Sequence, residues 1–173
     1  MADPFSDPEA LVRRVYAYVA YRIGDGPEAE DVTSEAFERA LRYRESFDIS
    51  RGDASSWLVG IARRCVADAV LRREVPIDEI IERPVDGHED AAVARLELRD
   101  AVAGLDERDR ELVALRYGAD LTAKQIGQLL EMKTNAVEVA LHRALGRLRA
   151  TLDPDGAAEP ESFVVKPKPE ASP

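Results

Sequence analysis

Apolar residues recur every three or four positions along most of this 173-residue sequence, and residues 1–75 contain no strand-like alternation. This periodicity predicts an all-α fold of amphipathic helices. Breaker-rich segments at 24–27 and 47–56 divide the first half into three predicted helices. Their apolar faces are formed by Leu11, Val12, Val15, Tyr16, Val19 and Ile23; by Val32, Ala36, Phe37, Ala40 and Leu41; and by Leu58, Ile61, Ala62, Cys65, Val66 and Ala69.

A stretch rich in charge and proline, residues 75–90, interrupts the helical pattern and predicts a linker. Beyond it, residues 98–105 fit a short lead-in helix, and residues 112–118 fit another that closes at Tyr117-Gly118. Thr122 and Gln125 then have the spacing of a capping box, which predicts the start of a helix. Apolar positions from 137 to 148 predict a further helix three or four residues after it. The pair is typical of a helix-turn-helix.

We therefore predict two small helical domains joined by an acidic linker. Residues 1–75 form the first domain, 76–103 the linker with its lead-in helix, and 104–152 the helix-turn-helix domain. The tail, residues 153–173, is rich in proline and polar residues, which favours disorder. Its apolar residues 163–165 leave open a second interpretation, a partner-binding segment.

The balance of charge restricts the partners of the chain. With 24 Lys and Arg against 34 Asp and Glu, its net charge of -10 argues against indiscriminate binding to nucleic acid. The distribution is uneven, however, because residues 76–103 hold 3 basic and 8 acidic residues whereas residues 104–152 hold 8 and 7. A local DNA contact by the helix-turn-helix is therefore compatible with the acidic total.

The sequence contains no recognisable catalytic or metal-binding motif. Cys65 is the single cysteine and cannot form an internal disulfide, and His88 and His142 are too far apart for a zinc-ligand pair. The N-terminus lacks the features of a secretory signal, and no apolar run approaches the roughly 18 residues of a membrane span. We expect a cytoplasmic, non-enzymatic protein without metal, cofactor or membrane insertion.

Two motifs, in order, resemble those of bacterial sigma factors. Residues 29–42 (AEDVTSEAFERALR) and 47–73 resemble sigma region 2, and residues 105–152 resemble sigma region 4. Because nothing between them is large enough for a region 3 domain, the chain is similar to the extracytoplasmic-function, or group 4, sigma factors. The resemblance covers about residues 10–152. It implies an alternative sigma subunit that directs promoter recognition, DNA opening and transcription initiation. The implied partners are core RNA polymerase, promoter DNA and an anti-sigma factor.

The resemblance also implies three groups of site residues. The polymerase-binding group is Asp31, Glu35, Phe37 and Arg39. The group for the minus-ten promoter element is Ser50, Arg51, Trp57, Arg63, Arg64, Asp68, Arg72 and Arg73. The group for the minus-thirty-five element, on the recognition helix, is Thr134, Asn135, Glu138, Val139 and Arg143.

Some of these residues have two possible roles. Phe37 is either an interface anchor or a core residue, and Trp57 either stacks on a base or holds its loop in place, the second being favoured. Many relatives carry Asn in place of Arg64, and relatives usually carry a basic Lys-Ser-Arg stretch in place of residues 138–140, so promoter preference does not transfer. Glu138 can accept a hydrogen bond from cytosine, or the helix binds DNA weakly and depends on polymerase docking.

Two other functions are compatible with the pattern. An autonomous helix-turn-helix regulator would bind operator duplex as a homodimer without polymerase. A helical protein that binds polymerase but has lost promoter readout would associate with the enzyme without activating any promoter.

Overall fold

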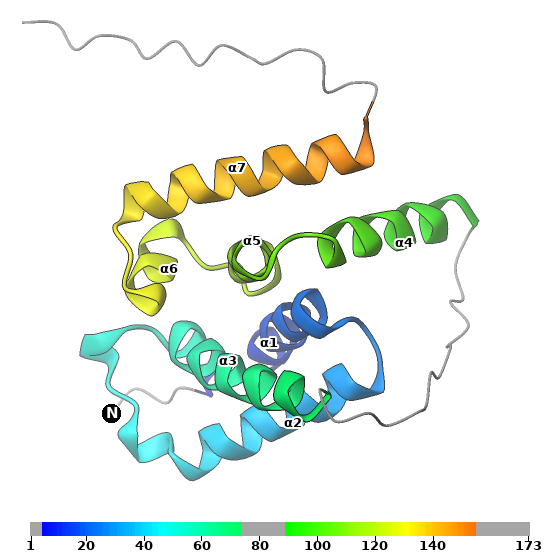
Figure 1. The fold of residues 1–173 in the computed structure, drawn as a ribbon. Coiled ribbons are helices and arrows are strands. Elements are labelled where there is room, and N and C mark those ends of the chain that lie inside the picture. Colours follow the sequence, from blue (N-terminus) through cyan, green and yellow to red (C-terminus); the bar gives the residue numbers. More distant parts are fainter. Residues whose placement is uncertain (1–4, 74–88, 155–173) are drawn as a thin grey trace, which may run out of the picture.

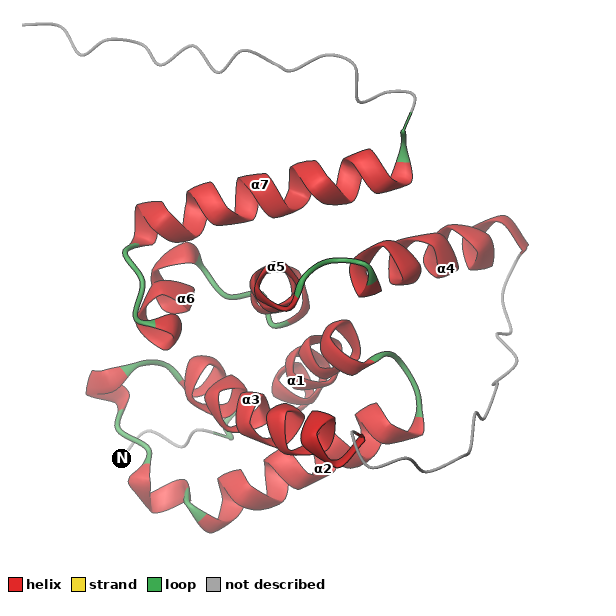
Figure 2. Cartoon of the chain, viewed as in Figure 1, coloured by secondary structure: helices red, strands yellow, loops and turns green. Residues whose placement is uncertain are grey.

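The computed structural model describes residues 5–73 and 89–154, and these residues form helices and connecting turns without a strand (Figure 2). The predicted all-α fold is therefore confirmed. In chain order the elements are α1 (Pro8–Ile23), α2 (Pro27–Arg42), the short 3-10 turns η1 (Arg44–Ser46) and η2 (Ile49–Arg51), α3 (Ala54–Arg73), α4 (Glu89–Ala103), α5 (Glu107–Val113), the π-helical turn η3 (Ala114–Gly118), α6 (Ala123–Leu130) and α7 (Thr134–Leu152).

Local signals account for most helix boundaries. Asp7 caps α1 by accepting a hydrogen bond from the Ala10 amide at 3.1 Å, and Gly24, with φ of +92°, ends that helix. At α6 the predicted capping box is confirmed, since Thr122 and Gln125 bond reciprocally. By contrast, Lys133 at the start of α7 provides no side-chain cap, so the first amides of that helix lack this support.

Figure 1 shows the arrangement of the two halves. Helices α1, α2 and α3 form a bundle around a core that includes Val15, Val32, Leu58 and Val66. In the second half, α7 lies along the outer side of α4, α5 and α6, and α1 contacts the opposite side. The second half therefore has α7, the predicted recognition helix, on one side and the first bundle on the other.

The two halves share a core, a contact that the sequence did not predict. Tyr18 of α1 and Leu112 and Leu115 of the second half are fully buried in one apolar cluster. Gly118, at the end of η3, lies directly on the α1 backbone, because a Cβ atom there would be only 2.9 Å from the Tyr18 nitrogen and Cα. A glycine is thus needed for this close approach between halves.

Three details differ from the predicted pattern. Val12 and Leu41, predicted to lie on apolar faces, are 45% and 54% exposed, because α1 and α2 bury narrower stripes than the spacing suggested. The lead-in helix α4 is longer than predicted and begins at Glu89, inside the segment assigned to the linker. The rest of that linker, residues 75–88, and nearly all of the proposed tail lie outside the described residues.

Candidate nucleic-acid interface

Four residues predicted to contact the minus-ten element surround one cleft, which we call the α3–α6 cleft. It has a volume of about 480 Å³ and lies between the η2 turn with α3 on one side and α6 on the other. The members of the predicted group that line it are Arg51, Trp57, Arg63 and Arg64. The α6 wall is formed by Gln125, Gln128 and Leu129. The cleft thus combines guanidinium groups with an aromatic ring, which suits a single-stranded nucleic acid.

Trp57 is partly buried and anchors the loop that precedes α3. Its ring centroid lies 5.4 Å from that of Phe47 and 6.5 Å from that of Phe5. These contacts agree with the favoured interpretation of Trp57 as a residue that holds the loop, while the same side chain also lines the cleft. In the loop, Ser50 donates to Asp48 from both its amide and its hydroxyl, and these bonds lower the pKa of Asp48.

Arg63 faces the second half and is ion-paired with it. Its Nε lies 2.7 Å from Oε1 of Glu111, a residue of α5 whose side chain is only 12% exposed. Glu111 also pairs with Arg22 of α1, whose side chain is 7% exposed, and Arg22 pairs in addition with Glu107. These charges form a largely buried cluster that joins α1, α3 and α5.

Tyr18 completes this cluster from within the core. Its hydroxyl donates to Glu111 Oε1 at 3.1 Å, and Arg22 donates to the Tyr18 oxygen at 3.4 Å. Burial raises the pKa of Tyr18, although the Arg22 charge opposes that shift. The phenol therefore stays protonated, as its hydrogen bond to a carboxylate requires.

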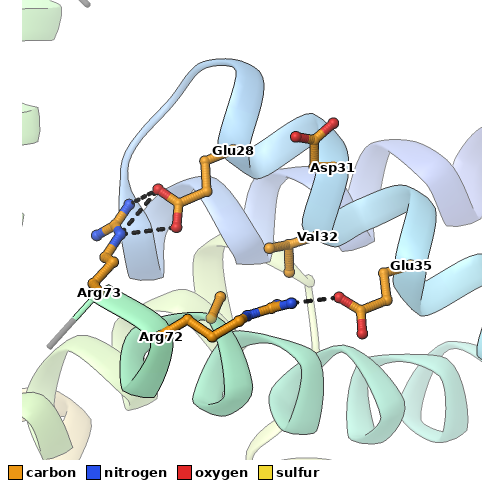
Figure 3. Close-up of a pocket in the computed structure, with 7 residues that line it drawn as sticks. Glu28, Asp31, Val32, Glu35, Arg72 and Arg73 are labelled. Carbon is orange, nitrogen blue, oxygen red and sulfur yellow. Dashed lines mark hydrogen bonds and ion pairs between the residues drawn. The ribbon is translucent and has the colours of Figure 1, made fainter. Parts of the chain in front are cut away.

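At the other end of α3, basic residues predicted to contact DNA meet acidic residues of α2. Figure 3 shows this α2–α3 pocket, whose volume is about 360 Å³. Arg73 Nε lies 2.8 Å from Glu28 Oε1, and Arg72 Nη2 lies 3.3 Å from Glu35 Oε2. Asp31 lines the same pocket, is exposed, and makes no ion pair within the described residues. The predicted minus-ten group is therefore divided between two sites on α3.

The remaining residues of the predicted polymerase-binding group belong to the same α2–α3 surface. Arg39 pairs with Glu35 and lies 2.9 Å from Asp68, and the Asp68 hydrogen bond raises the pKa of Arg39. Phe37 is partly buried and packs against the core, in agreement with its interpretation as a core residue. Of the charged residues in the predicted polymerase-binding group, Glu35 and Arg39 are ion-paired, whereas Asp31 has no ion pair within the described residues.

Helix α7, the predicted recognition helix, presents a different surface. Thr134, Asn135, Glu138 and Arg143 are exposed on α7, and Val139 is 51% exposed. Val137, Leu141, Ala144 and Leu148 form the opposite, buried face of the same helix. All five residues predicted to contact the minus-thirty-five element therefore lie on the face that solvent reaches.

Sequence reasoning missed the residues that join the halves, namely Tyr18, Arg22, Asp53, Glu107, Glu111, Gly118 and Gln125. The spacing of Glu107 and Glu111 places both carboxylates on one face of α5, which was an available signal. Their partners on α1 and α3, however, are 48 to 93 residues away, and no local pattern identifies them.

Two searches of the described residues gave negative results. No group of three or more His, Cys, Asp or Glu side chains in residues 5–73 and 89–154 is arranged to hold a metal ion. None of the helices in those ranges is long and apolar enough to cross a membrane.

Comparison with known families identifies two matching segments. Residues 9–75 match the model of sigma-70 region 2, and residues 95–148 match a model of sigma-70 region 4. The sequence is 35% identical over 152 residues to the ECF RNA polymerase sigma factor BldN of Streptomyces coelicolor, covering 83% of this chain. The matched part spans 57% of the length of that relative.

A second relative matches over nearly its whole length. The ECF RNA polymerase sigma factor SigW of Bacillus subtilis is 30% identical over 170 residues, with 87% of this chain and 89% of SigW covered. Among solved structures, the sigma factor RpoE of Bartonella quintana, in complex with the anti-sigma factor NepR, has the same fold. Its TM-score is 0.67 at 18% identity, over 84% of this chain and 93% of RpoE.

Proposed function

Because the chain belongs to the extracytoplasmic-function group of the sigma-70 family, we propose that it directs core RNA polymerase to promoters. The two proposed DNA-binding surfaces are the α3–α6 cleft and the exposed face of α7. Family membership favours this function over an autonomous helix-turn-helix regulator. The family consists of transcription initiation factors and is not known for enzymes. Since its partners are the transcribing polymerase and the chromosome, we place its action in the cytoplasm.

The observation that carries the proposal is the convergence of Arg51, Trp57, Arg63 and Arg64 on the α3–α6 cleft. An unpaired strand needs cationic groups for its phosphates and a flat surface for an unstacked base. Guanidinium groups serve both needs, because they bind phosphate oxygens and stack on bases. We assign the minus-ten element to this cleft. Asp68, Arg72 and Arg73 extend the same proposed group along α3, and Ser50 belongs to it in the η2 turn.

The α7 face is the proposed reader of the minus-thirty-five element. Thr134 and Asn135 begin the helix, the part that enters a major groove in helix-turn-helix proteins. Glu138 and Val139 stand one turn later, where a carboxylate can accept from cytosine N4 and an isopropyl group can contact a thymine methyl. Arg143 is better suited to a phosphate contact.

Polymerase binding is proposed for the α2–α3 surface, with Asp31, Glu35, Phe37 and Arg39 as its members. Charged residues around a partly buried aromatic ring provide orientation and an anchor. An anti-sigma factor is the second proposed protein partner, supported by the complex in which the similar RpoE fold was solved.

The direct test is multi-round transcription with purified core RNA polymerase and fragmented genomic DNA, with and without the chain, followed by mapping of the 5′ ends. New start sites that share two spaced upstream motifs are expected. If the chain co-elutes with core polymerase but yields no new starts, it is a polymerase-binding protein without promoter readout.

Matched substitutions assign the surfaces. Asp31→Lys is expected to weaken association with core polymerase, whereas Glu97→Lys, the same change on exposed α4, leaves it intact. The Arg51→Ala/Arg64→Ala variant is expected to lose promoter opening while keeping polymerase binding, and Arg13→Ala on exposed α1 provides its control. Equal losses of binding and opening would remove the DNA role of the two arginines.

A further inference from the structure

A groove between the end of α1 and the length of α4 is not used by the proposed function. We call it the α1–α4 groove; its volume is about 690 Å³, and Arg73 is the single residue of the predicted site groups that lines it. Two of its apolar side chains, Leu96 and Leu98 of α4, are 39% and 40% exposed. Apolar side chains that gather in a groove open to water are typical of an interaction surface.

Positive charge accompanies these apolar side chains. The lining of the groove contains five arginines and two aspartates. Three of the arginines are already engaged, two by glutamates and one by backbone carbonyl groups. The other two lie one turn apart on α4: Arg95 makes no ion pair within the described residues, and Arg99 Nε approaches Asp100 Oδ1 only to 3.6 Å. The groove therefore suits an occupant that is both apolar and acidic.

The C-terminal tail of the same chain contains a segment of this composition. Residues 159–165, which we call the tail segment, read Glu-Pro-Glu-Ser-Phe-Val-Val. Two carboxylates thus precede three consecutive apolar side chains, among them the aromatic ring of Phe163. Opposite charge and matching apolar character make this segment complementary to the groove.

The tail also starts beside the groove. Helix α7 ends at Leu152, and Leu148, one turn earlier, belongs to the apolar cluster of Val102 and Tyr21, both of which line the groove. Figure 1 shows this end of α7 above α4, with which it is in contact. Residues 153–162 separate α7 from Phe163 and span up to about 35 Å when extended. Since α4 is only about 22 Å long, Phe163 can reach every part of the groove.

We propose that the tail segment docks in the α1–α4 groove, with Phe163 among the apolar side chains and the two glutamates facing Arg95 and Arg99. The short tether raises the local concentration of the segment to the millimolar range, so a weak intrinsic affinity is sufficient. A second copy of the chain is a poorer occupant, because a symmetric contact through this groove would bring its arginines together. The inference goes beyond the proposed function, since docking of the tail requires neither polymerase nor DNA.

The first test measures whether the groove is covered in the full chain. Ala103→Cys introduces a thiol at an exposed position that lines the groove, and Ala94→Cys introduces one at an exposed position of α4 that does not. At 100° per residue these two positions lie on opposite faces of the helix. The rate of reaction with N-ethylmaleimide is measured by mass spectrometry of the digested protein, and the native thiol of Cys65 is buried.

Each introduced thiol is combined with the native tail, with Phe163→Ser, and with Ala171→Ser, a tail control outside the segment. We expect the Ala103→Cys thiol to react about fivefold faster with Phe163→Ser than with the other two tails, the factor for a tethered segment at several times its dissociation constant. The Ala94→Cys thiol should react equally in all three. Equal rates for the Ala103→Cys thiol would overturn the inference. Protection that increases with protein concentration would also overturn it, because the occupant would then be a second copy.

The second test exchanges the charges of the two partners. Arg95→Glu/Arg99→Glu reverses the α4 charges and should remove the protection of the Ala103→Cys thiol. Adding Glu159→Arg/Glu161→Arg should restore the protection, because the same pairs form with opposite signs.

The control for this exchange is Arg13→Glu/Arg108→Glu, which changes the net charge equally at two exposed positions outside the groove and should leave the protection unchanged. A chain with all four exchanged charges that has the helical circular dichroism of the native protein but no recovered protection would contradict docking of the tail segment.

Discussion

The minus-ten and minus-thirty-five surfaces differ in how far the chain already engages them. In the α3–α6 cleft, Arg63 is paired with Glu111 and α6 forms one wall. On α7, the five candidate residues point to solvent and Arg143 has no ion pair within the described part of the chain. Two surfaces with the same predicted role thus have different availability, which depends on packing rather than on residue type.

The largest expected effect on the free energy of unfolding comes from a substitution in the buried cluster of Arg22, Glu111 and Arg63. Arg22→Met leaves Glu111 poorly compensated in a site that excludes water, which should lower the free energy of unfolding by about 3 kcal/mol. Arg14→Met removes the exposed pair with Asp120 and should cost less than about 1 kcal/mol. Urea unfolding followed by circular dichroism measures both. Equal costs would mean that the cluster does not hold the halves together.

A wedge at the contact of the two halves should have the next largest effect. Gly118→Ala places a Cβ atom 2.9 Å from the Tyr18 backbone, and such overpacking costs about 1–3 kcal/mol. Gly146→Ala on α7 meets nothing within 4 Å and is the control, expected to be neutral or stabilising. Thermal unfolding compares the two, and an unchanged midpoint for Gly118→Ala would show that the approach is looser than described.

The salt dependence of DNA binding should differ between variants of Arg143, which has no ion pair within the described residues, and of Arg63, which is paired with Glu111. In the free chain, Arg143→Ala removes an available cation and should reduce the slope of log affinity against log salt by about 0.9 for duplex DNA. Arg63→Ala should change this slope little, because Glu111 already neutralises that guanidinium. Salt titrations of a fluorescent duplex distinguish them. Equal slopes for the two variants would contradict the claim that Arg143 is available to DNA in the free chain whereas Arg63 is not.

The smallest effect concerns the start of α7. Lys133 has the extended backbone of an N-cap but no side-chain acceptor, so Lys133→Ser should stabilise the chain by about 0.5–1 kcal/mol. Lys133→Ala separates the cap from the loss of a positive charge and should not stabilise. The urea midpoints of the two variants decide, and a gain for both would indicate that charge alone is responsible.

Much of the fold was predictable because its signals are local. The glycine at 24, the Thr122 capping box and the apolar spacing of α3 each act within a few residues, and the structure has the corresponding features. Val12 and Leu41 show the limit of this reasoning, since periodicity does not define how wide a stripe a neighbouring helix will cover.

The candidate site was predictable in residue type but not in arrangement. The resemblance identified Arg63, Arg64, Arg72 and Arg73 as one group, whereas the structure divides them between the α3–α6 cleft and the α2–α3 pocket. A helix of 20 residues is about 30 Å long, so residues at its two ends necessarily meet different neighbours. Sequence motifs contain no information about which neighbours those are.

Helix positions and caps follow from the order of the residues, because hydrogen bonds and side-chain spacing within a helix depend on near neighbours, and the acidic balance follows from composition alone. The pairing of Arg63 with Glu111, 48 residues later, depends instead on two helices meeting at one distance and one rotation. Gly118 permits the close approach of η3 to α1, and the charge cluster beside this contact is largely buried, so its pairing affects stability. Availability of Arg63 in the minus-ten group is therefore a property of packing, since this guanidinium would lose its Glu111 partner if the halves were apart.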